Sequence, residues 1–277
     1  MFEESSPAFE ARQHYKVMAG SIRVGTSGWS YAHWRGIFYP DRMPAREHFH
    51  FYAAEFDTVE LNNSFYRQPP LERFQAWGIE APPGFLFAVK GSRYISHVKR
   101  LLVEQESVNR VVEAATGLGD RLGPILFQFP RTFHADMERL DRFLSMLPPG
   151  FRFRLEFRHD SWLTDEVFDR LRARQVALCI PDHPKMPQAL VTTAGFAYVR
   201  MHMGARGIGY SAAALQRWAD RVLSWRSAGL DVFIYFNNDA EGYAIRNART
   251  LLRLLGEGER EGRDSNPGSG LKARSSA

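Results

Sequence analysis

Hydrophobic and polar residues alternate most regularly between Phe151 and Arg158, in the stretch FRFRLEFR. A period of two indicates a β-strand, because successive side chains of a strand point to opposite faces. This strand lies between two segments of helical periodicity, an arrangement in which both faces of a strand are usually buried. Buried charges are costly unless they are paired or functional. The pattern therefore raises the question of what Glu156 and its flanking arginines face.

Seven further apolar segments predict strands, and stretches with apolar residues at helical spacing separate most of them. The strands are expected at 21–27, 58–62, 85–90, 124–129, 176–180, 196–202 and 231–236. The helices are expected at 49–56, 71–77, 104–118, 137–147, 164–171, 211–222 and 244–255, with Thr164 and Ser211 as N-caps.

Strands that alternate with helices predict an α/β protein with a parallel sheet. Eight such units favour closure into a TIM-barrel-like (β/α)8 barrel, which we expect as a single domain over residues 21–256. An open doubly wound sheet is the alternative, but no GxGxxG follows the first strand and no GxxxxGK[ST] occurs. Residues 1–20 show no clean period and are expected to be a flexible segment. Residues 257–277 turn to Gly, Ser, Arg and Glu, so a disordered tail is expected there.

Composition narrows the functional classes. The formal net charge is +5, but lysines and arginines are dispersed, which favours a solvated surface over a nucleic-acid interface. Cys179 is the single cysteine and lies in the apolar run VALCI, as expected for a core residue in a reducing compartment. The acidic N-terminus lacks the apolar segment of a secretory signal, and no apolar run is long enough to span a membrane. A soluble, cytoplasmic protein is expected.

In a barrel of this class the functional site lies at the C-terminal ends of the strands. Glu60 and Glu156 lie at two such ends and are the expected acid/base residues, because catalysis needs a carboxylate in a partly dry cleft. His202 is a third catalytic candidate, since it shares a strand face with Arg200. The alternative is that both glutamates are structural ion-pair partners of Arg200, Arg158 or Lys90.

Lys90, Arg158 and Arg200 are expected to form an electropositive mouth suited to a phosphate or carboxylate. The other expected substrate-binding residues are Asn62, Gln128, Asn237, Asn238, Asp239 and Trp29. Trp29 belongs to an aromatic loop that would either stack on a ligand or cover the barrel rim. No metal site is predicted, because the sequence has no HxH or HExxH motif. Oxygen and imidazole ligands would have to come from different strands, from Glu60, Glu156, Asp182 and His202. No cofactor and no oligomeric state can be assigned.

A family resemblance rests on seven ordered segments. They read GTSGWSYAHWRGIFYP from Gly25, FDTVELNNSFYRQPP from Phe56, FLFAVKGSRYISH from Phe85, LGPILFQFP from Leu122, LEFRHDSW from Leu155, YVRMH from Tyr198 and VFIYFNND from Val232. Together they resemble the signature segments of the domain-of-unknown-function-72 family, also called YecE-like. The resemblance covers residues 22–256 and implies a TIM-barrel-like fold without implying an activity.

Three functions remain open at this point. The first is an enzyme that acts on a small polar or anionic substrate by carboxylate acid/base chemistry, with hydrolysis and isomerisation not separated. The second is a non-catalytic ligand-binding or interaction barrel. The third, motivated by the positive net charge and the aromatic loop, is a nucleic-acid-processing barrel.

Overall fold

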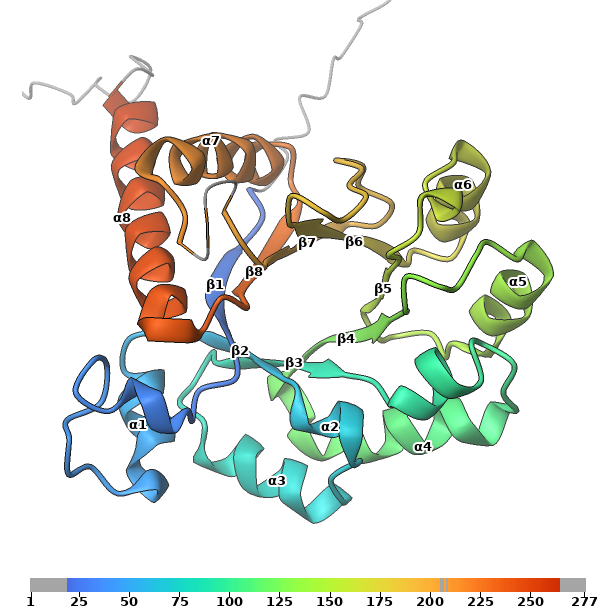
Figure 1. Cartoon of the computed structure of the whole chain (residues 1–277), viewed down its shortest axis with the longest axis horizontal. Helices are drawn as coiled ribbons and strands as arrows, with labels where there is room; N and C mark the ends of the chain where they lie inside the picture. The colour runs from blue at the N-terminus through green and yellow to red at the C-terminus, as the bar shows by residue number, and fades with distance from the viewer. Residues whose placement is uncertain (1–18, 205–206, 208, 265–277) are drawn as a thin grey trace, which may run out of the picture.

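Eight parallel strands close into a barrel in sequence order, and β1 pairs with β8 to complete the ring (Figure 1). The computed structural model describes residues 19–204, 207 and 209–264. The strands are β1 Ile22–Ser27, β2 Thr58–Leu61, β3 Leu86–Lys90, β4 Leu122–Gln128, β5 Phe153–Glu156, β6 Ala177–Asp182, β7 Phe196–Met201 and β8 Asp231–Phe236. The predicted single-domain parallel barrel is confirmed.

Helices surround the barrel (Figure 1). They are α1 His48–Ala53, α2 Asn63–Tyr66, α3 Leu71–Glu80, α4 Gln105–Ala115, α5 Met137–Met146, α6 Asp165–Ala173, α7 Ala212–Ser227 and α8 Tyr243–Asp264. Both predicted N-caps form: the side chain of Thr164 accepts from Val167 N, and that of Ser211 accepts from Ala214 N. Each cap satisfies one of the backbone N–H groups that a helix start leaves without an intrahelical acceptor.

Two departures from the predicted elements are local. Helix α2 and a π-helical turn at Tyr94–Val98 follow β2 and β3, and both are too short to show a helical period in the sequence. The connection from β6 to β7, residues 183–195, contains no α-helix, and none was predicted there. Helix α8 continues to Asp264, beyond the predicted end near 255, and an i,i+4 ion pair of 3.0 Å between Arg253 and Glu257 supports the extension.

Residues 257–264 of the predicted tail are therefore helical. The remainder of that tail, 265–277, and residues 1–18 of the predicted N-terminal segment lie outside the described residues. No helix of the described part of the chain combines the length and the apolar character needed to cross a membrane.

Strand β5 is buried on both of its faces. Phe153 and Leu155 pack into the layer between the strands and the helices, whereas Arg154 and Glu156 point into the barrel. The lower interior is filled mainly by apolar and aromatic side chains, namely Ala88, Leu126, Ala177, Cys179, Phe196, Tyr198, Phe233 and Tyr235. The charges of β5 are therefore enclosed by protein, as the position of this strand predicted.

Candidate functional site

A single guanidinium joins three strands in the upper part of the barrel. Arg200 on β7 is 1% exposed and donates from Nη2 to Glu60 Oε1 of β2 at 2.8 Å. Its Nη1 donates to Glu156 Oε2 of β5, also at 2.8 Å. Both glutamates are fully buried. The predicted alternative, in which these carboxylates pair with barrel arginines, is therefore realised for Arg200.

Every lone-pair direction of Glu60 is engaged. Ser27 Oγ donates at 2.7 Å and the Tyr198 hydroxyl at 2.6 Å, and Arg154 Nη2 adds a longer contact of 3.4 Å. Burial alone would raise the pKa of Glu60, but Arg200 and Arg154 outweigh it and lower the pKa to about 2. Glu60 is thus an ionised, hydrogen-bonded carboxylate at neutral pH.

Glu156 is equally enclosed. Gln128 Nε2 and Arg158 Nε donate to its Oε1 at 2.8 and 2.7 Å, and the thiol of Cys179 lies 3.7 Å from its Oε2. Burial raises the pKa of Glu156, but Arg200 and Arg158 hold it well below its ordinary value. A carboxylate of such low pKa is a weak base, and it carries no proton to donate at neutral pH.

Arg154 lies next to Glu60 in the barrel interior. Its guanidinium is fully buried, donates from Nη1 to the Pro124 carbonyl at 2.9 Å and lies 3.1 Å from the centre of the Tyr198 ring. The predicted site residues did not include Arg154, Tyr198, Ser27 or Cys179. For Arg154 and Tyr198 the available signal was strand phase, since they share faces with Glu156 and Arg200 respectively.

Lys90 ends β3 and is partly buried at the mouth of the barrel. Its Nζ lies 4.1 Å from the centre of the Phe65 ring, and among the described residues no carboxylate oxygen approaches it within 4.0 Å. Burial, followed by the charge of Arg200, lowers the pKa of Lys90 to about 8. Arg158 is also accessible, with 21% of its side chain exposed and only Nε in an ion pair.

His202 stands beside Glu156 on the lumen face of β7. Its Nδ1 accepts a hydrogen bond of 2.9 Å from Asn237 Nδ2, which places the proton of the neutral ring on Nε2. That Nε2 is buried, lies 4.0 Å from Glu156 Oε1 and has no hydrogen-bond partner among the described residues. Burial and then Arg200 lower the pKa of His202 to about 3, so the ring is neutral at physiological pH.

The remaining predicted residues do not join the cluster. Trp29 and Asn62 line a separate cavity of about 240 Å³ between the β1 loop and α3. Asn238 donates to Asn247 Oδ1 at 3.0 Å, and the Asp239 carbonyl accepts from Trp34 Nε1 at 3.1 Å. Asn238 and Asp239 therefore connect loops and α8 at the barrel rim.

Metal ligands do not converge in the described part of the chain, where no group of three or more His, Cys, Asp or Glu side chains could hold an ion. Of the four possible hard ligands, Asp182 lies apart from the other three, because its Oδ2 accepts from Trp218 Nε1 of α7 at 2.7 Å.

Comparisons with known proteins agree with this architecture. The chain is 25% identical over 270 residues to the UPF0759 protein YunF of Bacillus subtilis, covering 84% of this chain and 94% of that protein. The UPF0759 protein YecE of Escherichia coli K12 is 25% identical over 230 residues, covering 74% and 82%.

Two solved structures share the fold. A DUF72 family protein from Thermotoga maritima superposes with a TM-score of 0.71 at 27% identity, covering 85% of this chain and 99% of that one. A DUF72 family protein from Enterococcus faecalis superposes with a TM-score of 0.73 at 22% identity, covering 85% and 95%. The family described as "Protein of unknown function DUF72" matches residues 23–269. The chain belongs to the DUF72 family.

Proposed function

We propose that this barrel is an enzyme that binds a small anionic substrate at its C-terminal mouth and uses Lys90 for proton transfer. The observation that carries the proposal is a surplus of positive charge. Among the described residues, four cationic side chains but only two carboxylates meet in the upper barrel, and both carboxylates are already paired with arginines. A phosphate or carboxylate beside Lys90 and Arg158 would offset this surplus.

Lys90 has the properties of a general acid/base. With a pKa near 8, a substantial neutral fraction of its amine is present at physiological pH and can accept a proton and later return it. His202 complements it as a neutral ring whose Nε2–H has no acceptor among the described residues. Such a group can donate to negative charge that develops on a substrate oxygen.

The two glutamates take a positioning role in this proposal. The sequence favoured them as acid/base residues, but each is ionised and engaged by several donors. They hold the guanidinium groups of Arg200 and Arg158 in place, and so determine the electrostatic field around a bound substrate. A non-catalytic anion-binding barrel is the second candidate, because the same engagement leaves neither carboxylate free to react.

The first test measures anion binding. Isothermal titration with phosphate, sulfate and small dicarboxylates should show saturable binding that weakens at least tenfold in Lys90→Met and in Arg158→Met. Lys99→Met is the matched control, since Lys99 is an exposed lysine whose Nζ lies 5.7 Å from the centre of the Tyr94 ring. Equal affinities in all four proteins would refute the site.

The second test separates the two candidate functions. Phosphorylated and carboxylated compounds that bind are incubated with the protein and followed by NMR for product or for exchange of carbon-bound hydrogen with D₂O. Turnover that rises with pH through about 8 and disappears in Lys90→Met supports the enzyme. Binding without turnover or exchange by any ligand supports the non-catalytic barrel instead.

A further inference from the structure

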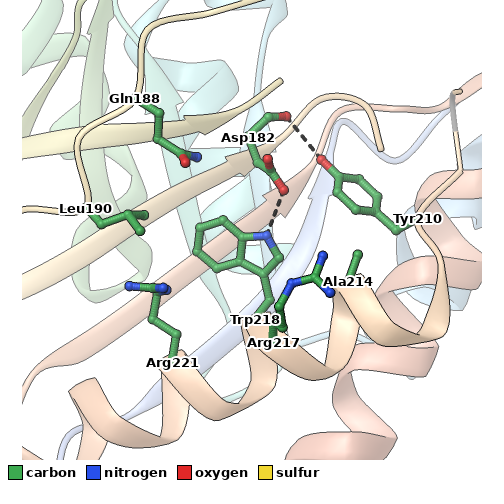
Figure 2. Close-up of a pocket in the computed structure, with 8 residues that line it drawn as sticks. All are labelled: Asp182, Gln188, Leu190, Tyr210, Ala214, Arg217, Trp218 and Arg221. Carbon is green, nitrogen blue, oxygen red and sulfur yellow. Dashed lines mark hydrogen bonds between the residues drawn. The ribbon is translucent and has the colours of Figure 1, made fainter. Parts of the chain in front are cut away.

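A second polar pocket lies outside the barrel mouth, between the C-terminal end of β6 and helix α7 (Figure 2). Its volume is about 230 Å³, and Gln188 and Leu190 close it on the side of the β6–β7 connection. The pocket contains one carboxylate, Asp182, and two guanidinium groups, Arg217 and Arg221. Its lining therefore carries two positive charges and one negative charge, a net charge of +1.

Asp182 is held in a defined orientation. Its Oδ2 accepts from Trp218 Nε1 at 2.7 Å, and its backbone oxygen accepts from the Tyr210 hydroxyl at 3.1 Å, as Figure 2 shows. No cation approaches the carboxylate within 4.0 Å in the described part of the chain. Burial raises the pKa of Asp182, and the Trp218 hydrogen bond and the more distant charge of Arg217 offset only part of that rise, so the carboxylate is withdrawn from water without a close ion-pair partner. An ammonium group placed in the pocket would supply that partner.

Gln188 offers a second acceptor for the same ammonium group. One of its two amide N–H groups donates to the Pro181 carbonyl at 3.0 Å, which fixes the orientation of the amide, and Oε1 is an acceptor. Gln188 and Asp182 line the same side of the pocket in Figure 2. An ammonium carries three N–H donors, so it can bond to both side chains at once.

The two arginines differ from most other helix arginines of this protein. Arg139, Arg170, Arg172 and Arg253 each form an ion pair with an acidic side chain. Arg217 and Arg221 are exposed one turn apart on α7, and within the described chain neither has an acidic partner within 4.0 Å. Like charges at this spacing destabilise a helix, and carboxylates bound beside them would offset the repulsion.

The geometry points to a binding site for a small molecule that carries one ammonium and two acidic groups, the chemistry of an acidic α-amino acid. The ammonium lies against Asp182 and Gln188, the α-carboxylate against Arg217, and the side-chain carboxylate against Arg221. Such a ligand carries one net negative charge at neutral pH and balances the charge of the lining. This site is separate from the barrel mouth and does not depend on the proposed function there.

The site lies beside the segment that follows β7 and carries His202. The Asp182 carbonyl accepts from the backbone N–H groups of His202 and Met203 at 3.0 and 3.3 Å, beside the pocket. A ligand held by the Asp182 side chain therefore contacts the residue that anchors the end of β7.

The test is isothermal titration of the full-length protein with L-glutamate and L-aspartate and with three analogues of glutamate. Glutarate lacks the ammonium, 4-aminobutanoate lacks the α-carboxylate, and L-glutamine lacks the side-chain charge. Saturable binding of glutamate or aspartate is expected, at least tenfold tighter than binding of the matching analogues. Absence of saturable binding by both amino acids, or glutarate binding as tightly as glutamate, would overturn the assignment.

Variants locate the site. Arg217→Met should weaken glutamate and glutamine alike by at least tenfold, whereas Arg221→Met should weaken glutamate and leave glutamine unchanged. Asp182→Asn should weaken glutamate and leave glutarate unchanged, with thermal denaturation confirming that the variant folds. Arg142→Met, an exposed arginine on α5, is the control. Because Arg217 and Arg221 are surface residues, their variants should fold, and unchanged affinity in both would refute the proposal.

Discussion

Arg200 and Glu60 form a two-pronged ion pair inside the barrel, with Nη2–Oε1 and Nε–Oε2 distances of 2.8 and 3.1 Å and almost no exposure of either side chain. The same arginine also holds Glu156. A buried pair of this kind is strongly destabilising to break from one side, because the remaining charge stays buried without its partner. The upper barrel is therefore a network in which the members depend on one another.

The first prediction concerns the stability of this network. Arg200→Met should lower the free energy of unfolding by about 3–5 kcal/mol, because it leaves two buried carboxylates without their shared cation. Urea denaturation followed by circular dichroism measures the change. Arg172→Met removes an exposed ion pair with Asp169 and should cost less than about 1 kcal/mol. Equal urea midpoints for the two variants would contradict this account.

The second prediction is a pH dependence of stability caused by Glu60. Its pKa in the folded protein is about 2, below its ordinary value of 4.5, so folding favours the ionised form. The stabilisation is therefore complete above about pH 4.5 and is lost as the pH falls toward 2. Thermal denaturation between pH 6 and 2.5 should show a shallower loss in Glu60→Gln than in the parent. Identical slopes would show that Glu60 does not contribute.

The third prediction is direct titration of Lys90. Reductive ¹³C-methylation labels lysine side chains for NMR, and the chain has only a few lysines, so Lys90→Arg identifies its signal. The Lys90 signal should titrate with a pKa of about 8. Arg158→Met should raise this pKa, because burial and Arg200 lower it most but the positive charge of Arg158 also lowers it. A pKa near 10.5 in the parent would remove Lys90 as an acid/base candidate.

The fourth prediction concerns the single thiol. Burial, followed by the charge of Glu156, raises the pKa of Cys179 well above its ordinary value, so little thiolate is present at neutral pH. Native protein should react with a thiol reagent such as DTNB far more slowly than protein unfolded in urea, which should release one equivalent. Rapid reaction of the native protein would show that the upper barrel opens.

The barrel itself could be predicted from sequence because each strand and helix leaves a local signal. The alternation of Phe153 and Leu155 with Arg154 and Glu156, placed between helical segments, indicated a strand buried on both faces, and it is so. Features shorter than a helical period, such as α2 and the π-helical turn, left no such signal. The long amphipathic period of α8 was recognised, but its end was misplaced because the composition beyond residue 256 turns to Gly, Ser, Arg and Glu.

The candidate site could be predicted only in part. The two-residue period of the strands predicted from sequence that Glu60, Glu156 and Arg200 point into the barrel, and these residues do meet there. Strand ends also suggested Asn238 and Asp239, and the aromatic loop suggested Trp29, but their side chains turn toward neighbouring loops or a lateral cavity. Beyond the last paired residue of a strand the two-residue period no longer holds, so loop packing decides the direction of each side chain.

By itself, the sequence determined the eight strands, their order and the polar character of the barrel mouth, because these follow from periodicity and from short-range chemistry. The tertiary structure alone decided which charges pair. Arg200 forms ion pairs with both glutamates, whereas the Lys90 ammonium lies above the Phe65 ring. Arg217 and Arg221 share a pocket with Asp182. Pairing depends on distances between residues far apart in the chain and on burial, which sets the strength of each charge. Neither these distances nor the burial of each charged group can be inferred from the local pattern of the sequence.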